Sequence, residues 1–278
     1  MSFLVLLVIV WVEKFSPLRQ RIQRDGVFLS ELGRLQAVPR LAREPWLLLL
    51  LLVGLPALVL GLLLWVLLPV AYGLLALPVH LLVLAYSLGR GDLKAALGPL
   101  RDAWRRGDDT AALHVAERDM AVQAQQANEL PREVQGWLMW RALESFFSVV
   151  FWYSLIGPVA ALAYRLLALV AEHATQPGLR ERAGQLVHAL DWLPARLPVA
   201  SFALVGDFIE VMRYLLHELL HWPTAARALV GQAGLLAADL PAEQTGAEAV
   251  AGVDALWALL QRAAVLWYAV LAVAALLY

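Results

Sequence analysis

The sequence predicts an all-α, polytopic membrane protein. Hydrophobic residues make up 61% of the 278 residues and charged residues only 16%, whereas soluble domains hold about 45–50% and about 25%. From Trp46 to Leu88, 43 consecutive residues contain no Lys, Arg, Asp or Glu, and the mean hydropathy of the chain is +0.67. A soluble globule of this size could not bury so much apolar surface. We find no strand-type alternation of useful length, so the expected elements are helices.

The composition also excludes several classes of function. The formal net charge is -1, and nucleic-acid binding needs a basic excess. The chain has no cysteine, which excludes disulfides, thiolate metal sites and thiol catalysis. Neither a GxxxxGK[ST] nor a GxGxxG phosphate-binding loop is present. We therefore expect no cofactor and no nucleic-acid partner, and the lipid bilayer as the main partner.

The uncharged run is expected to form a hairpin of two spanning helices, because one span needs only about 20 residues. Proline cannot donate within a helix, so Pro69 marks the turn between segments 46–67 and 70–88. Pro56 and Pro78 are expected to kink these helices. His80 is interpreted as a hydrogen-bonded packing residue rather than a ligand.

Two further segments, 145–164 and 263–278, are candidate spans. Gly157 and Pro158 should bend or break the first of them, and Arg165 is expected to reach back to the head groups. Segment 2–12 is too short to span and is expected to be a partly inserted or interfacial helix. Tryptophans near the ends of the apolar runs suggest an aromatic belt: Trp11, Trp46, Trp65 and Trp267.

The charges suggest an orientation in the membrane. Residues 13–45 hold seven Lys/Arg against four acids, so the positive-inside rule places them in the cytoplasm. The hairpin then returns residues 89–144 to the same side. Residues 165–262 lie on the far side if 145–164 crosses fully, and in the cytoplasm if that segment is re-entrant. We treat 1–278 as a single membrane domain.

The polar segments 89–144 and 165–262 are expected to be helical and packed at the membrane face. Asp92 is expected to cap one helix, and Thr110 to open another that runs to Leu130. Residues 207–221 are predicted to form a helix with one polar stripe. The apolar stretch 197–206 is too short to span a membrane. Asp108 and Asp109 follow Gly107 and are interpreted as a turn with a helix cap.

One motif could hold a metal. His217, Glu218 and His221 match the HExxH pattern, in which two histidines bind zinc and the glutamate polarises a bound water. The same residues also fall on the polar stripe of their helix. No third ligand is marked, since Glu243 and Glu248 are candidates by distance only. We therefore assign no metal and no catalytic residue, and keep the zinc protease as a minor alternative.

A second polar group lies beside two prolines, Pro194 and Pro198. Asp191, Trp192 and Arg196 stand within six residues, just before the apolar stretch and Asp207. Asp191 and Arg196 could form a buried ion pair that caps two helices. The alternative is that Asp191, Trp192, Arg196 and Asp207 form a polar site that binds a lipid head group or a phosphate.

Four blocks carry a resemblance to a known family: LDWLPARL at 190–197, ALVGDF at 203–208, FWYSLIGPVAALAYRL at 151–166 and LGRGDLKAAL at 88–97. The chain resembles the AmpE family over essentially its whole length. The resemblance implies an inner-membrane regulatory protein linked to β-lactamase induction. The same superfamily contains adenosylcobinamide-phosphate synthase, a membrane enzyme of cobalamin synthesis.

Departures from the synthase pattern separate the two branches. Tyr164-Arg165 is not followed by the Asn, Asp and Lys of the synthases, and Pro198 replaces the Thr that follows their PARL block. We therefore expect a signalling protein and not an enzyme. We expect it to bind either a partner protein of peptidoglycan recycling or a ligand derived from the cell wall or from lipid. A homo-oligomer is a further expected form. The alternative is a membrane enzyme related to the synthase that acts on an amphiphilic substrate.

Overall fold

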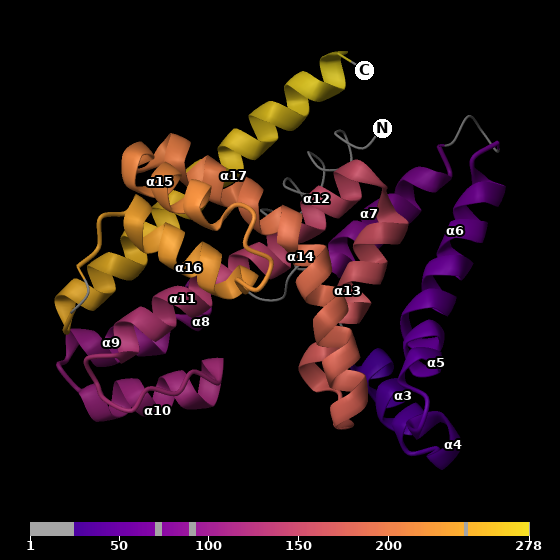
Figure 1. Ribbon diagram of the computed structural model, residues 1–278, viewed down its shortest axis with the longest axis horizontal. Coiled ribbons are helices and arrows are strands. Elements are labelled where there is room, and N and C mark those ends of the chain that lie inside the picture. The colour runs from indigo at the N-terminus through magenta and orange to yellow at the C-terminus, as the bar shows by residue number, and fades with distance from the viewer. Residues whose placement is uncertain (1–24, 70–73, 89–92, 242–243, 278) are drawn as a thin grey trace. The chain divides into compact units, whose positions relative to one another are not determined.

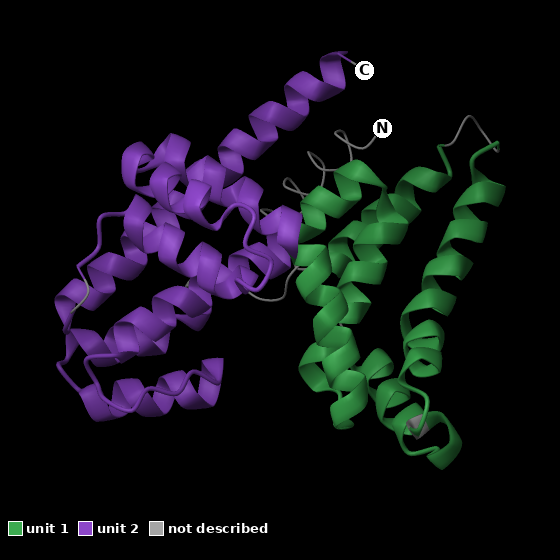
Figure 2. Cartoon of the chain, viewed as in Figure 1, with its two compact units in different colours: residues 1–90, 148–191 green, residues 91–147, 192–278 purple. Residues whose placement is uncertain are grey.

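The computed structural model describes residues 25–69, 74–88, 93–241 and 244–277. These residues form helices joined by turns, and none of them is in a strand, which confirms the all-α prediction (Figure 1). The chain divides into two compact units (Figure 2). Unit 1 holds residues 1–90 and 148–191, and unit 2 holds residues 91–147 and 192–278. The predicted interfacial segment 2–12 and the cap at Asp92 lie outside the described residues.

Unit 1 is built around the first apolar hairpin. It contains the following helices: α3 (Gly26–Gln36), α4 (Pro39–Ala42), α5 (Pro45–Leu49), the π-helical segment η1 (Leu50–Gly54), α6 (Leu55–Leu67), α7 (Ala76–Ser87), α12 (Ser148–Leu155), α13 (Pro158–His173) and the first half of α14 (Pro177–Val205). Helix α13 packs against both α6 and α7. Buried leucines of α5 and η1 meet α13 and α14 in one apolar cluster, which includes Leu48, Leu52 and Leu167.

Unit 2 contains the more polar helices. They are α8 (Leu93–Ala96), α9 (Gly98–Arg105), α10 (Asp109–Met120), α11 (Leu130–Ala142), the π-helical segment η3 (Leu143–Phe147), the second half of α14, α15 (Phe208–Glu218), α16 (Ala226–Ala237) and α17 (Ala247–Leu277). Helix α11 packs against α16 and α17. The backbones of α11 and α16 come close at two glycines, since a Cβ added to Gly231 would lie in van der Waals contact with Cα of Gly136, at 3.5 Å.

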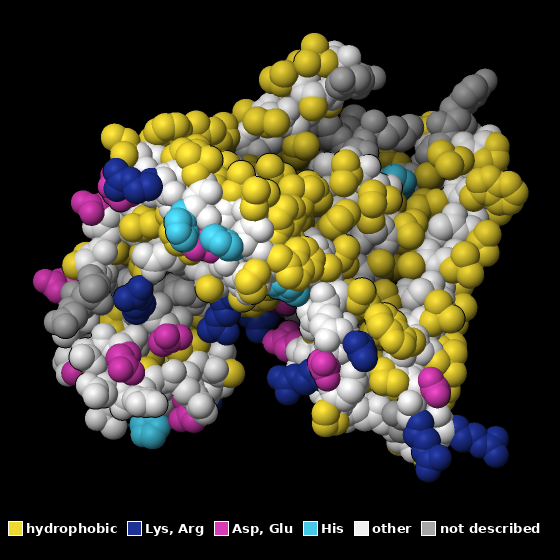
Figure 3. All heavy atoms as spheres, in the orientation of Figure 1, with side chains coloured by type: hydrophobic (Ala, Val, Ile, Leu, Met, Phe, Trp, Pro, Cys, Tyr) yellow, Lys and Arg dark blue, Asp and Glu magenta, His cyan; other side chains and the backbone are white. Residues whose placement is uncertain are grey.

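Among the described residues, two helices are long and apolar enough to cross a membrane. Residues Pro45–Leu67 form one through α5, η1 and α6, and Ala247–Leu277 form the other. Only 28% and 17% of their most apolar windows are buried within the structure, whereas the core helix of a soluble protein would be mostly buried. Exposed leucine, valine and tryptophan side chains cover α6, which appears in Figure 3 as a yellow edge of unit 1. Such a surface is typical of contact with a membrane or with another protein.

The first predicted span agrees with the structure and the second is shorter. Segment 46–67 is one helical run. Its π-helical turn ends at Gly54, two residues before Pro56, which has no N–H for the carbonyl of Leu52. Segment 70–88 forms only the twelve-residue α7, while residues 70–73 lie outside the description. His80 shares a hydrogen bond of 2.9 Å with Tyr153, as expected for a hydrogen-bonded residue between packed helices.

The third and fourth predicted spans also differ in length from the prediction. Segment 145–164 is broken as expected, since α12 ends at Leu155 and α13 begins at Pro158. Gly157 has φ 105° and ψ -167°, a conformation open only to glycine. The described part of the apolar segment 263–278, residues 263–277, is the second half of the longer helix α17. Trp267 was predicted for the aromatic belt but is buried, and its indole donates to Ser201 at 2.9 Å.

Two other predictions were wrong. The helix opened at residue 110 does not reach Leu130: α10 ends at Met120, and Ala121 adopts a left-handed conformation with φ 53°. Its N-cap is Asp108, which accepts from the amide of Ala111, as the predicted turn requires. Arg165 does not reach outward, because it is buried in unit 1 and pairs with Asp25 at 3.3 Å.

Candidate functional site

Arg196 is the centre of a polar contact inside unit 2. Its guanidinium donates to four main-chain carbonyls: Leu219 at 2.7 Å, Trp192 at 2.6 Å, and Glu218 and His221 at 3.2 Å each. Three of these carbonyls belong to the end of α15 and the turn after it, where carbonyls have no helical partner. Arg196 therefore caps α15, and this geometry favours a structural role.

The ring of Trp192 adds to this contact. The guanidinium carbon of Arg196 lies 4.0 Å from the ring centroid of Trp192, which is close enough for a cation–π interaction. The ring of Trp222 lies 6.1 Å from that of Trp192. Burial lowers the pKa of Arg196, and the carboxylate of Glu218 opposes this shift. The guanidinium is thus held by carbonyls and an indole.

Asp191 belongs to a different contact, in unit 1. It is completely buried and accepts hydrogen bonds from Ser148 and Tyr164, both at 2.8 Å. These donors come from α12 and α13, so the carboxylate ties α12, α13 and α14 together. The described hydrogen bonds of Asp191 and Arg196 go to different partners, whereas the sequence had suggested a single ion pair as one interpretation.

Asp207 is the N-cap of α15, where its side chain accepts from the amide of Glu210 at 3.0 Å. The helix has 11 residues, so Asp207 lies about 16 Å along the axis from the end capped by Arg196, at about 1.5 Å a residue. It lines a small hollow of about 150 Å³ in unit 2, together with Arg132 and Gln232. Asp207 and Arg196 therefore do not share one polar site.

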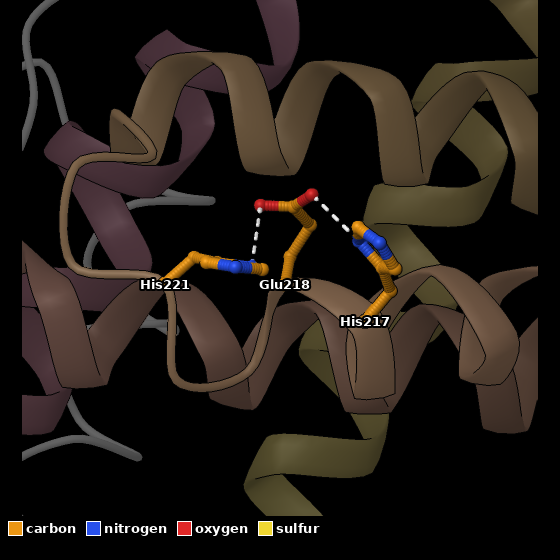
Figure 4. A group of neighbouring side chains, drawn as sticks. All are labelled: His217, Glu218 and His221. Atoms are coloured by element: carbon orange, nitrogen blue, oxygen red, sulfur yellow. Dashed lines mark hydrogen bonds and ion pairs between the residues drawn. The ribbon is translucent and has the colours of Figure 1, made fainter.

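The HExxH residues lie where α15 ends. The helix stops at Glu218, so His221 stands in the following turn rather than on the next helical turn. Figure 4 shows the carboxylate of Glu218 between the two imidazoles. Nδ1 of His217 lies 3.0 Å from one carboxylate oxygen, and Nδ1 of His221 lies 3.8 Å from the other. Hydrogen bonds from Thr224, first, and from His217 lower the pKa of Glu218.

Unit 1 contains a groove that the sequence did not predict. Its volume is about 550 Å³, and it is bounded by α3, η1, α6, α7 and α13. The lining is apolar apart from Glu31 and Tyr86, and it includes Phe28, Leu55 and Leu162. A run of leucines gives no sequence signal for which side chains face a groove and which face lipid.

The chain was compared with known protein families, curated proteins and solved structures. The family model described as regulatory signalling modulator protein AmpE matches residues 1–272. The chain belongs to the AmpE family. This confirms the resemblance drawn from the four sequence blocks and supports a regulatory role. Searches of curated proteins and of solved structures found no significant match to this AmpE-family chain.

Proposed function

We propose that this AmpE-family protein is a multi-pass protein of the bacterial inner membrane that regulates β-lactamase induction by binding an amphiphile. Membership of the family supports the regulatory role. The groove of unit 1 is the observation that supports an amphiphile as the ligand. In this proposal the apolar chain of a lipid or of a wall precursor lies in the groove, and its occupancy is the regulatory signal.

The groove suits such a chain in both size and chemistry. Its volume of about 550 Å³ falls within the range of about 300–1,000 Å³ typical of small-molecule sites. Its two polar lining residues, Glu31 and Tyr86, are outnumbered by leucine, valine, phenylalanine and proline. Glu31 is paired with Arg34 at 2.7 Å on the exposed face of α3.

A polar head would be accommodated at the α3 end of the groove. Charged side chains gather around α3 and α4 in Figure 3, at one end of the apolar surface of α6. A chain that follows α6 from this end would keep its head among charged groups and its tail among leucines. An amphiphile therefore fits better than a wholly polar wall fragment.

The membrane arrangement belongs to the same proposal. Segments 46–67, 70–88, 145–164 and 263–278 would be the membrane segments, with residues 13–45 in the cytoplasm. Reporter fusions near residues 30 and 110 should both report a cytoplasmic location. A fusion near residue 200 separates a full crossing of 145–164 from a re-entrant one. The signal would pass to a protein partner of peptidoglycan recycling or to a second copy of the chain.

Two tryptophan substitutions on α6 test the groove. Leu55 lines it, whereas Leu58 does not contribute to its lining, and the two side chains are similarly exposed, at 51% and 60%. Leu55→Trp should fill the groove and abolish regulation of β-lactamase induction by a β-lactam. Leu58→Trp should behave as the wild type, and both variants should reach wild-type abundance in the membrane.

A direct measurement complements the induction assay. A fatty acid with a photoreactive diazirine should crosslink to groove residues such as Phe28 and Leu162, and Leu55→Trp should reduce this labelling. Equal induction in the two tryptophan variants, or labelling that spreads evenly over the exposed face of α6, would contradict the proposal.

A further inference from the structure

We propose that His217, Glu218 and His221 bind one divalent transition-metal ion of the zinc, nickel or copper class at the end of α15. Each residue offers one donor atom, and the three donor atoms all lie within 4.8 Å of one another. Imidazole nitrogen and carboxylate oxygen are donors that these ions accept. The site is independent of the proposed amphiphile groove, which belongs to the other unit.

The distances are close to those of a metal site. Metal–ligand bonds of about 2.0–2.1 Å in a tetrahedral arrangement place neighbouring donors about 3.3 Å apart. The two imidazole-to-carboxylate distances, 3.0 Å for His217 and 3.8 Å for His221, lie on either side of this value. The imidazole centroids are 5.5 Å apart. Small rotations of exposed side chains would therefore bring all three donors onto one ion.

The arrangement differs from that of an HExxH protease. In that motif both histidines lie on successive turns of one helix, and the glutamate acts on the bound water. Here α15 ends at Glu218, and the carboxylate faces both imidazoles (Figure 4). Glu218 itself thus supplies the third donor that the sequence did not mark. The site would hold a metal that links α15 to the following turn.

The surroundings hold these donors in place. The hydroxyl of Thr224 donates to the carboxylate of Glu218 at 2.6 Å, and such outer contacts orient metal-binding carboxylates. Arg196 donates to the carbonyl of Leu219 at 2.7 Å, and more weakly to those of Glu218 and His221 at 3.2 Å, and so holds the main chain of the turn. The side chains of His217 and His221 are 75% and 57% exposed, so an ion can enter from solvent and keep water as a fourth ligand.

Calorimetric titration of the full chain tests this site. The protein, purified in detergent without a polyhistidine tag and stripped with a chelator, is titrated with Zn²⁺. We expect one ion per chain. Glu218→Gln and His221→Asn should weaken binding about 100-fold, and Thr224→Val about 10-fold. His114→Asn is the matched control, because His114 is an exposed histidine of α10 in the same unit.

Electron paramagnetic resonance of Cu²⁺ bound to the wild type gives a second readout that needs no variant. Two coordinated imidazoles should split the signal through two nitrogens, and His221→Asn should reduce this pattern to one. Zn²⁺ binding that is no tighter in the wild type than in a His217→Asn/His221→Asn double variant would overturn the proposal. A copper spectrum without nitrogen coupling would do the same.

Discussion

Removal of the Arg196 guanidinium is the most direct test of how α15 is held. Arg196→Met keeps most of the aliphatic stem but deletes the hydrogen bonds to the four carbonyls and the cation–π interaction with the indole of Trp192. The substitution should therefore leave the last carbonyls of α15 without their donors. We expect a loss of stability in unit 2, with α15 fraying from its C-terminal end.

The magnitude follows from the two short bonds. Hydrogen bonds to a charged group contribute about 1.5–3 kcal/mol each, and the bonds to Leu219 and Trp192 are 2.7 and 2.6 Å long. The two bonds of 3.2 Å reach the ends of an exposed turn, where water can replace them, so we count them as zero. Release of the buried charge from its desolvation offsets part of the remainder. The expected loss is about 2–3 kcal/mol.

The assay is reversible unfolding of the purified protein in mixed detergent micelles, followed by helical circular dichroism. The matched control is Arg213→Met on the same helix, since Arg213 is 69% exposed and pairs only with its neighbour Glu210 among the described contacts. Arg213→Met should stay within about 0.5 kcal/mol of the wild type, as surface substitutions usually do. If Arg196→Met also stays within this limit, the capping argument is wrong.

The same variant separates a structural from a ligand-binding role. Loss of regulation in step with loss of membrane abundance would fit the capping role. Loss of regulation at full abundance and full stability would instead favour Arg196 as a ligand-binding residue, the alternative that the sequence left open.

Two further predictions concern unit 1. Gly157→Ala should destabilise the protein by about 1–3 kcal/mol in the same unfolding assay, because alanine does not adopt the backbone conformation of Gly157. The control is Gly184→Ala within α14, which should be neutral or stabilising, because nothing lies within 4 Å of the added Cβ. Equal effects of the two substitutions would contradict the argument from backbone conformation. Tyr164→Phe should cost about 1.5–3 kcal/mol, because it removes a hydrogen bond of 2.8 Å to a buried carboxylate. The reasoning fails if Tyr164→Phe unfolds at the wild-type midpoint.

The resemblance to the AmpE family and the all-α fold class could both be predicted from the sequence. Long uncharged runs, rather than local propensity, indicated helices in lipid, and Pro45–Leu67 appears as expected. The break at Gly157 was also predictable, because glycine followed by proline cannot continue a helix there. The end of α10 at Met120 was missed, since a left-handed alanine carries no sequence signal.

The candidate site was harder to predict than the fold. Sequence proximity grouped Asp191 with Arg196, but along a helix, neighbours five residues apart point in different directions. Their partners, Ser148 and the end of α15, are distant in the chain. The role of Glu218 depends on α15 stopping one residue after His217. Arg196, from another helix, caps this end through its 2.7 Å bond to the carbonyl of Leu219.

The sequence by itself determined that the chain is helical, apolar enough for lipid and a member of the AmpE family. Composition and the order of motifs are properties of the linear chain and do not depend on which residues are in contact. Only the tertiary structure decided which leucines line the groove, which carbonyls hold Arg196 and which donors surround Glu218. Those features depend on side chains from separate helices meeting in space, and no local pattern encodes such a meeting.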